Sequence, residues 1–465
     1  MRSKRSTPRM KKVMATLFAS AAAVALTSCS GGGSGGGDDD TIKVAYGSDY
    51  VFLSPEVADQ WWHKVAADFE AANPGKKVEL IPIPGGFSDI VSKLNLLYRN
   101  PSTAPDVAEI PDENLAGWVA SEYLLPLDDY LADAEFWKNY PDSIKKQNTI
   151  DGKVYAVNHG ENTSGLWYNI PMFKKAGLPV PWQPKTWDDV TAAAEKIKQT
   201  SPEAWPVWLT GGTSGGTSAM QFGPANLVAG SSTPTIFDEE TQKWVVDSPG
   251  LREVMAFYVN LAKNGLQSPS AQLLDPNNVV NSFQLLADQK AAISFSGNYL
   301  GPTWTKEVCA PCFPEASEVW ATAPLPSIHG TANPNIATVM GGWDLTISAD
   351  SSKPDLAWKF IEAAQTAENM IGFANGTGTV PPDKTLWSDQ RFSEAAAPYN
   401  EFFASLLPAA KPLPSLPDFP VWATGFGMAT GQIVQDPSTT VDAAIQTMKD
   451  YITGQLGADK VETLS

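Results

Sequence analysis

The segments TIKVAYG at residues 41–47 and VADQWWHKVAADFEAANPG at residues 57–75 decide the fold of this chain. In the first segment, apolar and polar residues alternate, which predicts a strand. In the second, apolar residues recur every four positions from Val57 to Phe69, so they form one face of a helix. The sequence Asn73-Pro74-Gly75 ends that helix. A strand followed by an amphipathic helix is the start of a β-α-β unit.

The pattern continues through two more strands. Residues 78–83 and 107–110 predict strands, and apolar residues between positions 90 and 97 predict the face of a second helix. The resulting β-α-β-α-β order implies a parallel sheet that helices cover. Ligands bind to such sheets outside the carboxyl ends of the strands. The loops at these ends are residues 47–50, 85–87 and 111–114.

The rest of the chain contains four further helical patterns and no internal repeat. Thr186 with Asp189 forms a capping-box pattern that opens the first helix, and Ser248-Pro249 opens the second. The apolar faces of these helices cover residues 190–197, 251–261, 356–361 and 441–452. The proline-rich segment 411–420 is expected to cross the surface.

The first 28 residues have the pattern of a secretory signal peptide. Basic residues precede an apolar run from Val13 to Leu26, which is shorter than the ~20 residues of a membrane-spanning helix. The cysteine that follows, Cys29, resembles the lipobox cysteine of bacterial lipoproteins. That resemblance implies that Cys29 is lipidated and becomes the mature N-terminus. The alternative is an ordinary signal peptide, with Cys29 incidental.

Residues 29–40 are expected to form a flexible tether. They are mostly glycine and serine and end in three aspartates, so they cannot bury apolar surface. No later segment offers the roughly eighteen uninterrupted apolar residues that a membrane span needs. We therefore expect an extracytoplasmic protein that a lipid, rather than a membrane span, anchors to the bacterial cell membrane.

Composition limits the partners of the chain. After residues 1–28, about 437 residues remain, which suits two large lobes better than one core. The first 28 residues hold six of the 33 Lys and Arg residues, so 27 remain against 51 Asp and Glu, a net charge of −24. This charge argues against nucleic acid and against an anionic membrane surface as partners. The 16 Trp and 12 Tyr residues are numerous, and large flat side chains suit sugar rings as well as cores.

Only two cysteines follow Cys29. Cys309 and Cys312 have the spacing of redox Cys-X-X-Cys motifs, but no strand-then-helix pattern surrounds them. A zinc site would need a second pair of ligands, and the chain has only three His. Outside the cytosol, we expect a small local disulfide between Cys309 and Cys312.

Several ordered segments identify a family. The most specific stretch is Gly152-Lys153-Val154-Tyr155-Ala156-Val157, followed by Trp167-Tyr168-Asn169 and by residues 172–178. Further matching segments are residues 69–75, 104–107, 125–128, 186–189, 290–299 and 341–343. In this order, they resemble the carbohydrate-type solute-binding proteins of bacterial ABC importers, the group that includes maltose-binding protein. The resemblance covers residues 41–455.

The resemblance implies an α/β, two-lobe fold of the type II periplasmic-binding-protein kind, each lobe a mainly parallel sheet flanked by helices. Crossings between the lobes are expected near residues 157–161, 335–340 and 381–386. Lobe 1 would hold residues 41–158 and 338–384, and lobe 2 residues 160–336 and 388–465.

The same resemblance implies how the protein works. An oligosaccharide would lie in the cleft between the lobes, and closure around it would present both lobes to an ABC permease. No cofactor, no metal and no covalent chemistry are expected, and the protein is expected to be a monomer.

Sugar recognition needs flat apolar faces and fixed polar groups in a preformed cleft. The resemblance points to Tyr299 as a stacking aromatic, with the amide of Asn298 beside it to hold hydroxyls. Gly342 would let the backbone approach the ligand next to Trp343 and Asp344, although the same residues also describe a buried strand face.

Other candidates follow predicted strands or the first crossing. These candidates are Phe87, Asp112, Glu113, Glu161 and Asn162. The aromatic candidates on the second lobe are Trp205, Trp208 and Trp422, for which core packing is the alternative.

Enzyme functions have weak support. The segment 212–216 fits the nucleophile-elbow pattern, but Pro206 interrupts the preceding run and only His329 follows as a base. A glycoside hydrolase needs two opposed carboxylates at a sugar site, and a chain with 51 acidic residues can always supply a candidate pair. Among binding proteins, a peptide or polyamine receptor would use acidic side chains in the cleft, and three scattered His disfavour a metal receptor. We therefore expect a sugar-binding protein and not an enzyme.

Overall fold

The computed structural model describes residues 40–49, 54–214, 216–306 and 308–465. The expected signal peptide, Cys29 and nearly all of the tether lie outside the described residues, as does Tyr50 of the first strand-end loop. Within the described ranges, no helix combines the length and the apolar character that a membrane crossing requires.

The N-terminal region forms the expected parallel sheet. Strand β1 (Thr41–Gly47) pairs in parallel with β2 (Lys77–Ile83) and with β3 (Val107–Pro111). Helices α1 (Pro55–Ala72) and α2 (Phe87–Tyr98) connect them. The β-α-β-α-β prediction is therefore confirmed.

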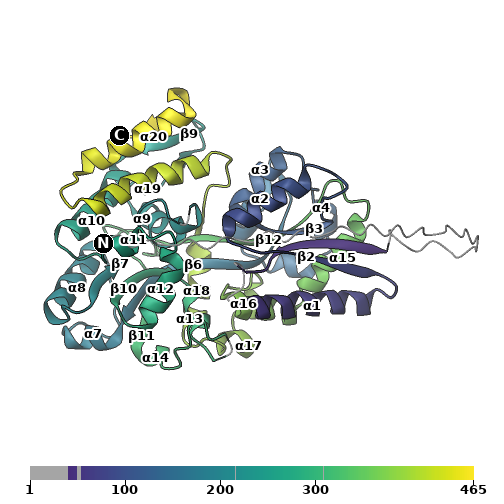
Figure 1. Ribbon diagram of the computed structural model, residues 1–465, viewed down its shortest axis with the longest axis horizontal. Helices are drawn as coiled ribbons and strands as arrows, with labels where there is room; N and C mark the ends of the chain where they lie inside the picture. The colour runs from purple at the N-terminus through teal and green to yellow at the C-terminus, as the bar shows by residue number, and fades with distance from the viewer. Residues whose placement is uncertain (1–39, 50–53, 215, 307) are drawn as a thin grey trace, which may run out of the picture. The chain divides into compact units, whose positions relative to one another are not determined.

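Nine strands form one sheet with the main order β2-β1-β3-β12-β6-β10-β7. Two long strands, β6 (Val157–Asn169) and β12 (Val339–Ile347), occupy its centre (Figure 1). We call lobe 1 the part built on β1, β2 and β3, and lobe 2 the part built on β7 (Trp205–Trp208), β10 (Ala291–Gly297) and β11 (Trp320–Ala323).

Strand β6 belongs to both lobes. Its first residues pair with β12, which in turn pairs with β3 of lobe 1. Its later residues, from Ser164 to Asn169, pair with β10 and β11 of lobe 2. The chain therefore crosses between the lobes inside one continuous strand.

The remaining elements of lobe 1 are short helices, one hairpin and two helices from late in the chain. They are η1 (Asp112–Asn114), α3 (Leu115–Ala120), α4 (Asp128–Leu131), α5 (Glu135–Lys138), α6 (Asp142–Gln147), β4 (Thr149–Ile150), β5 (Lys153–Val154), α15 (Pro354–Ala364) and α16 (Ala367–Thr377).

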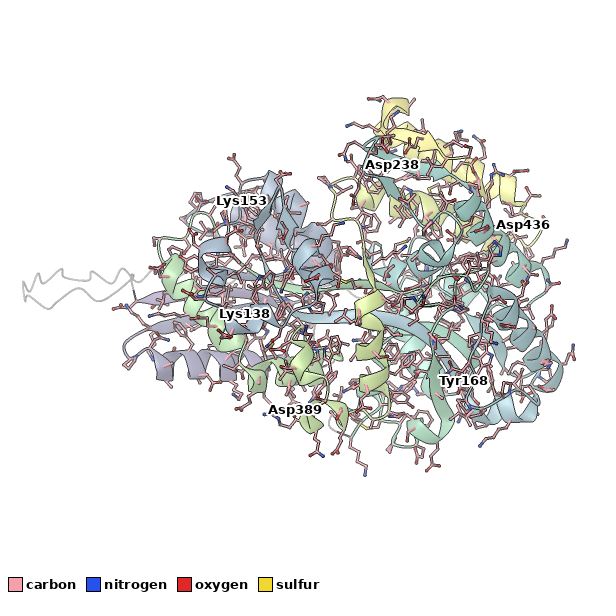
Figure 2. All side chains as sticks on the ribbon, turned by 180° about the vertical axis from the view of Figure 1, so that it is seen from behind. Lys138, Lys153, Tyr168, Asp238, Asp389 and Asp436 are labelled. Atoms are coloured by element: carbon pink, nitrogen blue, oxygen red, sulfur yellow. A yellow bond between two sulfur atoms is a disulfide. The ribbon has the colours of Figure 1, made fainter. Side chains whose placement is uncertain are left out.

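Lobe 2 is built mainly from helices. They are α7 (Ile170–Lys175), α8 (Trp187–Thr200), η2 (Ser218–Gln221), α9 (Pro224–Gly230), α10 (Pro249–Lys263), α11 (Ser270–Leu273), α12 (Asn278–Ala287), α13 (Leu300–Thr303), α14 (Ala316–Val319), α18 (Tyr399–Leu406), α19 (Phe419–Gln435) and α20 (Val441–Leu456). A small separate sheet joins β8 (Phe237–Asp238), β9 (Lys243–Asp247) and β14 (Val461–Thr463). The labelled side chains of Tyr168, Asp238 and Asp436 mark this lobe, and those of Lys138 and Lys153 mark lobe 1 (Figure 2).

The predicted capping residues begin their helices. Thr186 and Asp189 form a reciprocal capping box at the start of α8, and Oγ of Ser248 accepts a hydrogen bond from the backbone N–H of Leu251 at 3.1 Å. Such caps satisfy N–H groups that the first helical turn leaves without partners.

The late segments of the chain contact both lobes. The backbone of Val380 pairs with Glu161, and Asn139 donates a hydrogen bond to Asp383 at 3.0 Å in lobe 1. Further on, the hydroxyl of Tyr399 donates to the carbonyl oxygen of Trp320 at 3.0 Å in lobe 2. Between these contacts lie η3 (Lys384–Leu386) and α17 (Gln390–Ser393).

The proline-rich segment then returns to the centre of the sheet. After η4 (Leu407–Ala409), strand β13 (Lys411–Pro412) pairs with β12, and Ser415 Oγ accepts from the N–H of Ala116 and donates to the carbonyl oxygen of Asp112. Both side chains of β13 are exposed, in agreement with the expected surface crossing.

Candidate functional site

A cleft of about 300 Å³ lies between residues of the two lobes. Lobe 1 and its late segment contribute Asp49, Phe87, Pro111, Glu113, Thr377 and Thr379. The crossing strands contribute Asn162, Gly341, Gly342 and Trp343, and lobe 2 contributes Gln221, Phe222, Val279, Val280, Phe283, Tyr299, Thr303 and Ala310. Asp49, Phe87 and Glu113 follow the carboxyl ends of β1, β2 and β3, where ligands of parallel sheets bind.

A second, larger cavity of about 540 Å³ is lined by residues of α6, α9 and the segment 411–416. None of the residues that the sequence predicts for the site lines it. Its outer residues include the exposed Lys146 and Lys411. The smaller cleft, which has aromatic rings from both lobes together with amide and carboxyl groups, is the better candidate for a ligand site.

Tyr299 belongs to a group of three aromatic rings on the lobe 2 side of the cleft. Its ring centroid lies 5.0 Å from that of Phe222 and 5.7 Å from that of Phe283. Its hydroxyl accepts a hydrogen bond from the backbone N–H of Gly297 at 3.0 Å. A Cβ at Gly297 would lie 2.5 Å from the Tyr299 ring, so this ring position depends on glycine.

Trp343 lies on the crossing strand β12 beside two glycines. A Cβ at Gly342 would lie 2.2 Å from the carbonyl oxygen of Gly160, so only glycine lets β12 and β6 approach this closely. The pairing of the two strands shifts register between Trp343 and Asp344. Such a bulge changes the direction of neighbouring side chains, and here Trp343 lines the cleft while Asp344 does not.

Four buried carboxyl groups line the cleft or lie next to its lining residues. Asp112, Glu113, Glu161 and Asp344 are all buried. Burial raises the pKa of each group, and the charge of Asp112 further raises the pKa of Glu113, Glu161 and Asp344. The ion pairs among the described residues include none with these four carboxyls.

Neutral partners and backbone groups hold the carboxyl groups in place. Asp112 accepts a hydrogen bond from the backbone N–H of Gly342 at 2.5 Å and another from Gln147. Asn158 donates to Glu161 at 3.1 Å, and Asn148 donates to Asp344 at 3.1 Å.

Glu113 also connects the two lobes. Its Oε1 accepts a hydrogen bond from Oγ1 of Thr217, in the loop before η2 of lobe 2, at 3.2 Å. This contact lies at the cleft because Glu113 is one of its lining residues. It therefore forms only while the two lobes are close together.

The structure brings six of the sequence-predicted residues to the cleft lining. They are Phe87, Glu113, Asn162, Tyr299, Gly342 and Trp343. Asp112, Glu161 and Asp344 lie buried beside these residues, where they bind backbone and amide groups.

The side-chain amide of Asn298 binds backbone groups of three segments. Its Oδ1 accepts from the backbone N–H of Thr163 at 2.9 Å, and its Nδ2 donates to the carbonyl oxygens of Gly378 at 2.5 Å and Glu161 at 3.3 Å. The amide therefore joins three backbone segments and does not line the cleft.

The three tryptophans proposed for lobe 2 also lie outside the cleft lining. Trp422 of α19 is buried, and its Nε1 donates to the carbonyl oxygen of Val245 in β9 at 2.7 Å. Trp208 is buried and stacks on the partly buried Trp205, with ring centroids 6.1 Å apart. These positions agree with the core-packing alternative.

Sequence reasoning missed seven lining residues of lobe 2: Gln221, Phe222, Val279, Val280, Phe283, Thr303 and Ala310. The spacing of Val279, Val280 and Phe283 on one helix side was available as a pattern. It does not reveal whether this side meets a core or a cleft. Asp49, by contrast, lies in a strand-end loop that the β-α-β pattern did indicate.

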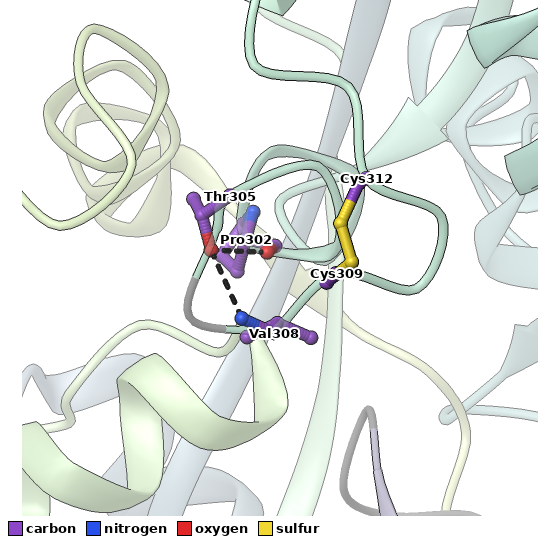
Figure 3. The surroundings of a disulfide bond; sticks show 5 residues. All are labelled: Pro302, Thr305, Val308, Cys309 and Cys312. Carbon is purple, nitrogen blue, oxygen red and sulfur yellow. Dashed lines mark hydrogen bonds between the residues drawn. A yellow bond between two sulfur atoms is a disulfide. The ribbon is translucent and has the colours of Figure 1, made fainter.

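The loop after α13 forms part of the cleft wall. The structure joins Cys309 to Cys312 by a disulfide (Figure 3). Thr305 Oγ1 donates to the carbonyl oxygen of Pro302 at 2.9 Å and accepts from the N–H of Val308 at 3.4 Å. Between the two cysteines lies Ala310, a lining residue of the cleft.

Ser214 and His329, the candidates for a nucleophile and its base, have separate partners in the structure. Ser214 of the glycine-rich segment donates to the carbonyl oxygen of Leu274 at 3.4 Å, and the exposed His329 lies 3.8 Å from Glu253. Among the residues that the structure describes, no three His, Cys, Asp or Glu side chains form a group that could hold a metal ion.

The fold and the cleft between lobes define a two-lobe binding protein. Residues 54–371 match the sequence profile of the bacterial extracellular solute-binding protein family. This match covers more than half of the chain, and the protein therefore belongs to this family. Membership confirms the expected class, a binding protein rather than an enzyme, and agrees with the extracytoplasmic location.

Individual relatives are distant and similar in length. The chain is 25% identical over 331 residues to the multiple sugar-binding protein of Streptococcus mutans, covering 70% of this chain and 73% of the relative. It is 24% identical over 369 residues to the diacetylchitobiose binding protein DasA of Streptomyces coelicolor, covering 78% of each chain.

A solved structure supports the fold. The sugar-binding protein MalE from Xanthomonas citri superimposes with a TM-score of 0.73 at 20% identity, covering 89% of this chain and 98% of that chain. This similarity confirms the expected two-lobe α/β fold.

Proposed function

We propose that this protein is the substrate-binding component of a bacterial ABC importer that captures an oligosaccharide in the cleft between lobes 1 and 2. The observation that carries the proposal is the lining of the cleft, where aromatic rings and hydrogen-bonding groups come from both lobes. A ligand that touches both lobes in the closed state stabilises closure by its difference in affinity for the two states. The names of two relatives, a multiple sugar-binding and a diacetylchitobiose binding protein, agree with a carbohydrate ligand.

In the proposed recognition, aromatic rings and polar groups contact different parts of the sugar. Tyr299, Trp343 and Phe87 would contact the C–H faces of sugar rings, and Asn162 and Glu113 would bind hydroxyl groups. Asp112, Asp344 and Glu161 would hold the cleft floor, since each binds its neighbours below the lining.

The cellular setting is part of the proposal. Lobe 1 would consist of residues 41–158 and 338–384, and lobe 2 of residues 160–336 and 388–465. We propose that Cys29 carries the lipid anchor, and that the protein works as a monomer that delivers its ligand to the permease.

A thermal-shift screen tests the proposal. Maltotriose, cellobiose, N,N′-diacetylchitobiose, mannitol, spermidine and tetra-alanine would each be added to the purified protein. We expect a saccharide to raise the melting temperature, because binding to the folded state alone stabilises it. We also expect that saccharide to be recovered uncleaved.

A polyamine is the second candidate, because Asp49 and Glu113 line the cleft and the lining residues that the structure describes include no Lys, Arg or His. A shift with spermidine and none with any saccharide would favour that ligand and contradict the carbohydrate proposal.

A further inference from the structure

The lobe 2 side of the cleft has an apolar part that a sugar ring alone does not require. Val279, Val280 and Phe283 of α12 line the cleft together. Val280 is 60% exposed, which makes it one of the few exposed large apolar side chains among the described residues. An aromatic ring offers a flat face to a sugar, whereas a valine offers neither a flat face nor a hydrogen-bonding group.

Several hydroxyl groups near this part bind within the protein. The hydroxyl of Tyr299 accepts from the N–H of Gly297 at 3.0 Å. Oγ1 of Thr303 donates to the carbonyl oxygen of Leu300 at 2.6 Å, and Oγ of Ser282 donates to that of Val279 at 2.6 Å. The protons of the Thr303 and Ser282 hydroxyls are therefore used within the protein, and the three α12 side chains contribute only carbon surface to the lining.

The rest of the cleft adds polar groups to the rings of Phe87 and Trp343. Asp49, Glu113 and Asn162 bring carboxyl and amide groups to the lining from lobe 1 and from β6. The carboxyl groups among the described lining residues thus all come from outside lobe 2, in a cleft of about 300 Å³.

We propose that Val279, Val280 and Phe283 form a subsite for an apolar substituent of the sugar ligand, either an N-acyl group or an aglycone. A sugar hydroxyl placed against the valines would lose its water without gaining a hydrogen bond. A methyl or aryl group in the same place buries apolar surface, which is favourable. This inference rests on the proposed function and specifies its ligand class.

Matched ligand pairs test the subsite. Isothermal titration calorimetry would compare cellobiose with N,N′-diacetylchitobiose, and methyl with phenyl β-cellobioside. We expect at least one substituted sugar to bind about fivefold or more tightly than its plain partner, since each buried methylene is worth roughly a factor of four. The first pair reports on an N-acyl group and the second on an aglycone.

Variants of α12 test whether these side chains cause the preference for the substituted sugar. Val280→Asn should reduce the preference for the substituted sugar to about twofold or less, and Phe283→Leu should reduce it in the same direction. The ratio of the two affinities within a pair is the readout, because Phe283 also contacts the Tyr299 ring. Leu96→Asn is the matched control, because Leu96 is 59% exposed on α2 and does not line the cleft. It should leave the preference unchanged.

Equal affinities within both pairs would overturn the subsite while leaving the proposed function intact. The subsite would also be overturned if Val280→Asn changed the preference for the substituted sugar no more than Leu96→Asn does. Absence of binding by every saccharide in the screen would contradict the proposed function itself, and the subsite with it.

Discussion

At the scale of single residues, Tyr299 and Trp343 show how the cleft gains two ring faces. Each depends on a nearby glycine: Gly297 makes room for the Tyr299 ring, and Gly342 lets β12 and β6 lie close beside Trp343. The residue types are visible in the sequence, but the direction of each ring is set by these close backbone contacts.

We predict that Trp343→Ala and Tyr299→Ala each weaken saccharide binding by roughly 1–3 kcal/mol, the cost of losing a buried anchor. Titration calorimetry with the saccharide found in the screen measures the change. The control is Trp205→Ala, which removes a ring outside the cleft and should leave the affinity unchanged. Loss of affinity in the control alone would contradict the assignment of the cleft.

A second prediction concerns the buried carboxyl of Asp344. Burial, together with the charge of Asp112, raises its pKa well above the ordinary value of 3.8. The folded state therefore binds a proton that the unfolded state releases, and stability falls as the pH rises from about 4 through the raised pKa. Asp344→Asn has no proton to lose, so its free energy of unfolding should fall less over this range.

Urea unfolding between pH 4.5 and pH 9 measures this difference. Asp436→Asn is the control, because hydrogen bonds from Ser438 lower the pKa of the Asp436 carboxyl. A lowered pKa makes stability depend on pH only on the acid side of the ordinary pKa. Above pH 5, the free energy of unfolding of Asp436→Asn should therefore change with pH as that of the unmodified protein does. An Asp344→Asn variant with the same loss of stability as the unmodified protein would contradict the prediction.

At the scale of elements, local patterns predicted the strands and helices well. The alternation in residues 41–47 and the period of four in residues 57–69 gave β1 and α1, and Thr186 and Ser248 mark true helix starts. These features depend on neighbours in sequence, which a single chain reveals.

The contribution of α12 to the cleft could not be predicted in the same way. Val279, Val280 and Phe283 form an apolar side that looks like any core-facing helix side. Whether such a side meets a core or a cleft depends on residues far away in the chain, such as Trp343 and Phe87, which share the cleft lining. The hydrogen bonds of the Asn298 amide could not be predicted for the same reason, because its three backbone partners lie up to 137 positions away.

The disulfide loop provides a prediction at this scale. The Cys309→Ser, Cys312→Ser double variant should lose at most about 2 kcal/mol of stability, since so short a loop constrains the unfolded chain only slightly. Hydrogen exchange should rise at the N–H of Ala310, which donates to the carbonyl oxygen of Thr303 at 2.8 Å. Exchange in α20 serves as the control and should not change. Equal exchange at Ala310 in both proteins would show that the disulfide does not hold this part of the wall.

At the scale of the whole molecule, the hydrogen bond between Thr217 and Glu113 joins the lobes at the cleft. We predict that Thr217→Val favours a more open ligand-free protein, because the valine cannot donate to the Glu113 carboxyl. Small-angle X-ray scattering should then give a larger radius of gyration without ligand and the usual value with saturating saccharide.

The control for this variant is Thr235→Val, which removes a hydroxyl that bonds within lobe 2, to the carbonyl oxygen of Phe237. Its scattering should match that of the unmodified protein. Identical scattering by Thr217→Val would show that the hydrogen bond does not influence closure.

Strand β6 pairs with β12 near its start and with β10 and β11 near its end. If one lobe unfolds, β6 loses partners, and the sheet of the other lobe is disturbed as well. The two lobes therefore differ from domains that only a linker joins. Differential scanning should record one endotherm for the pair, and a bound sugar should move that single peak upward as a whole. Two separate peaks would mean that the shared strand transmits little cooperativity.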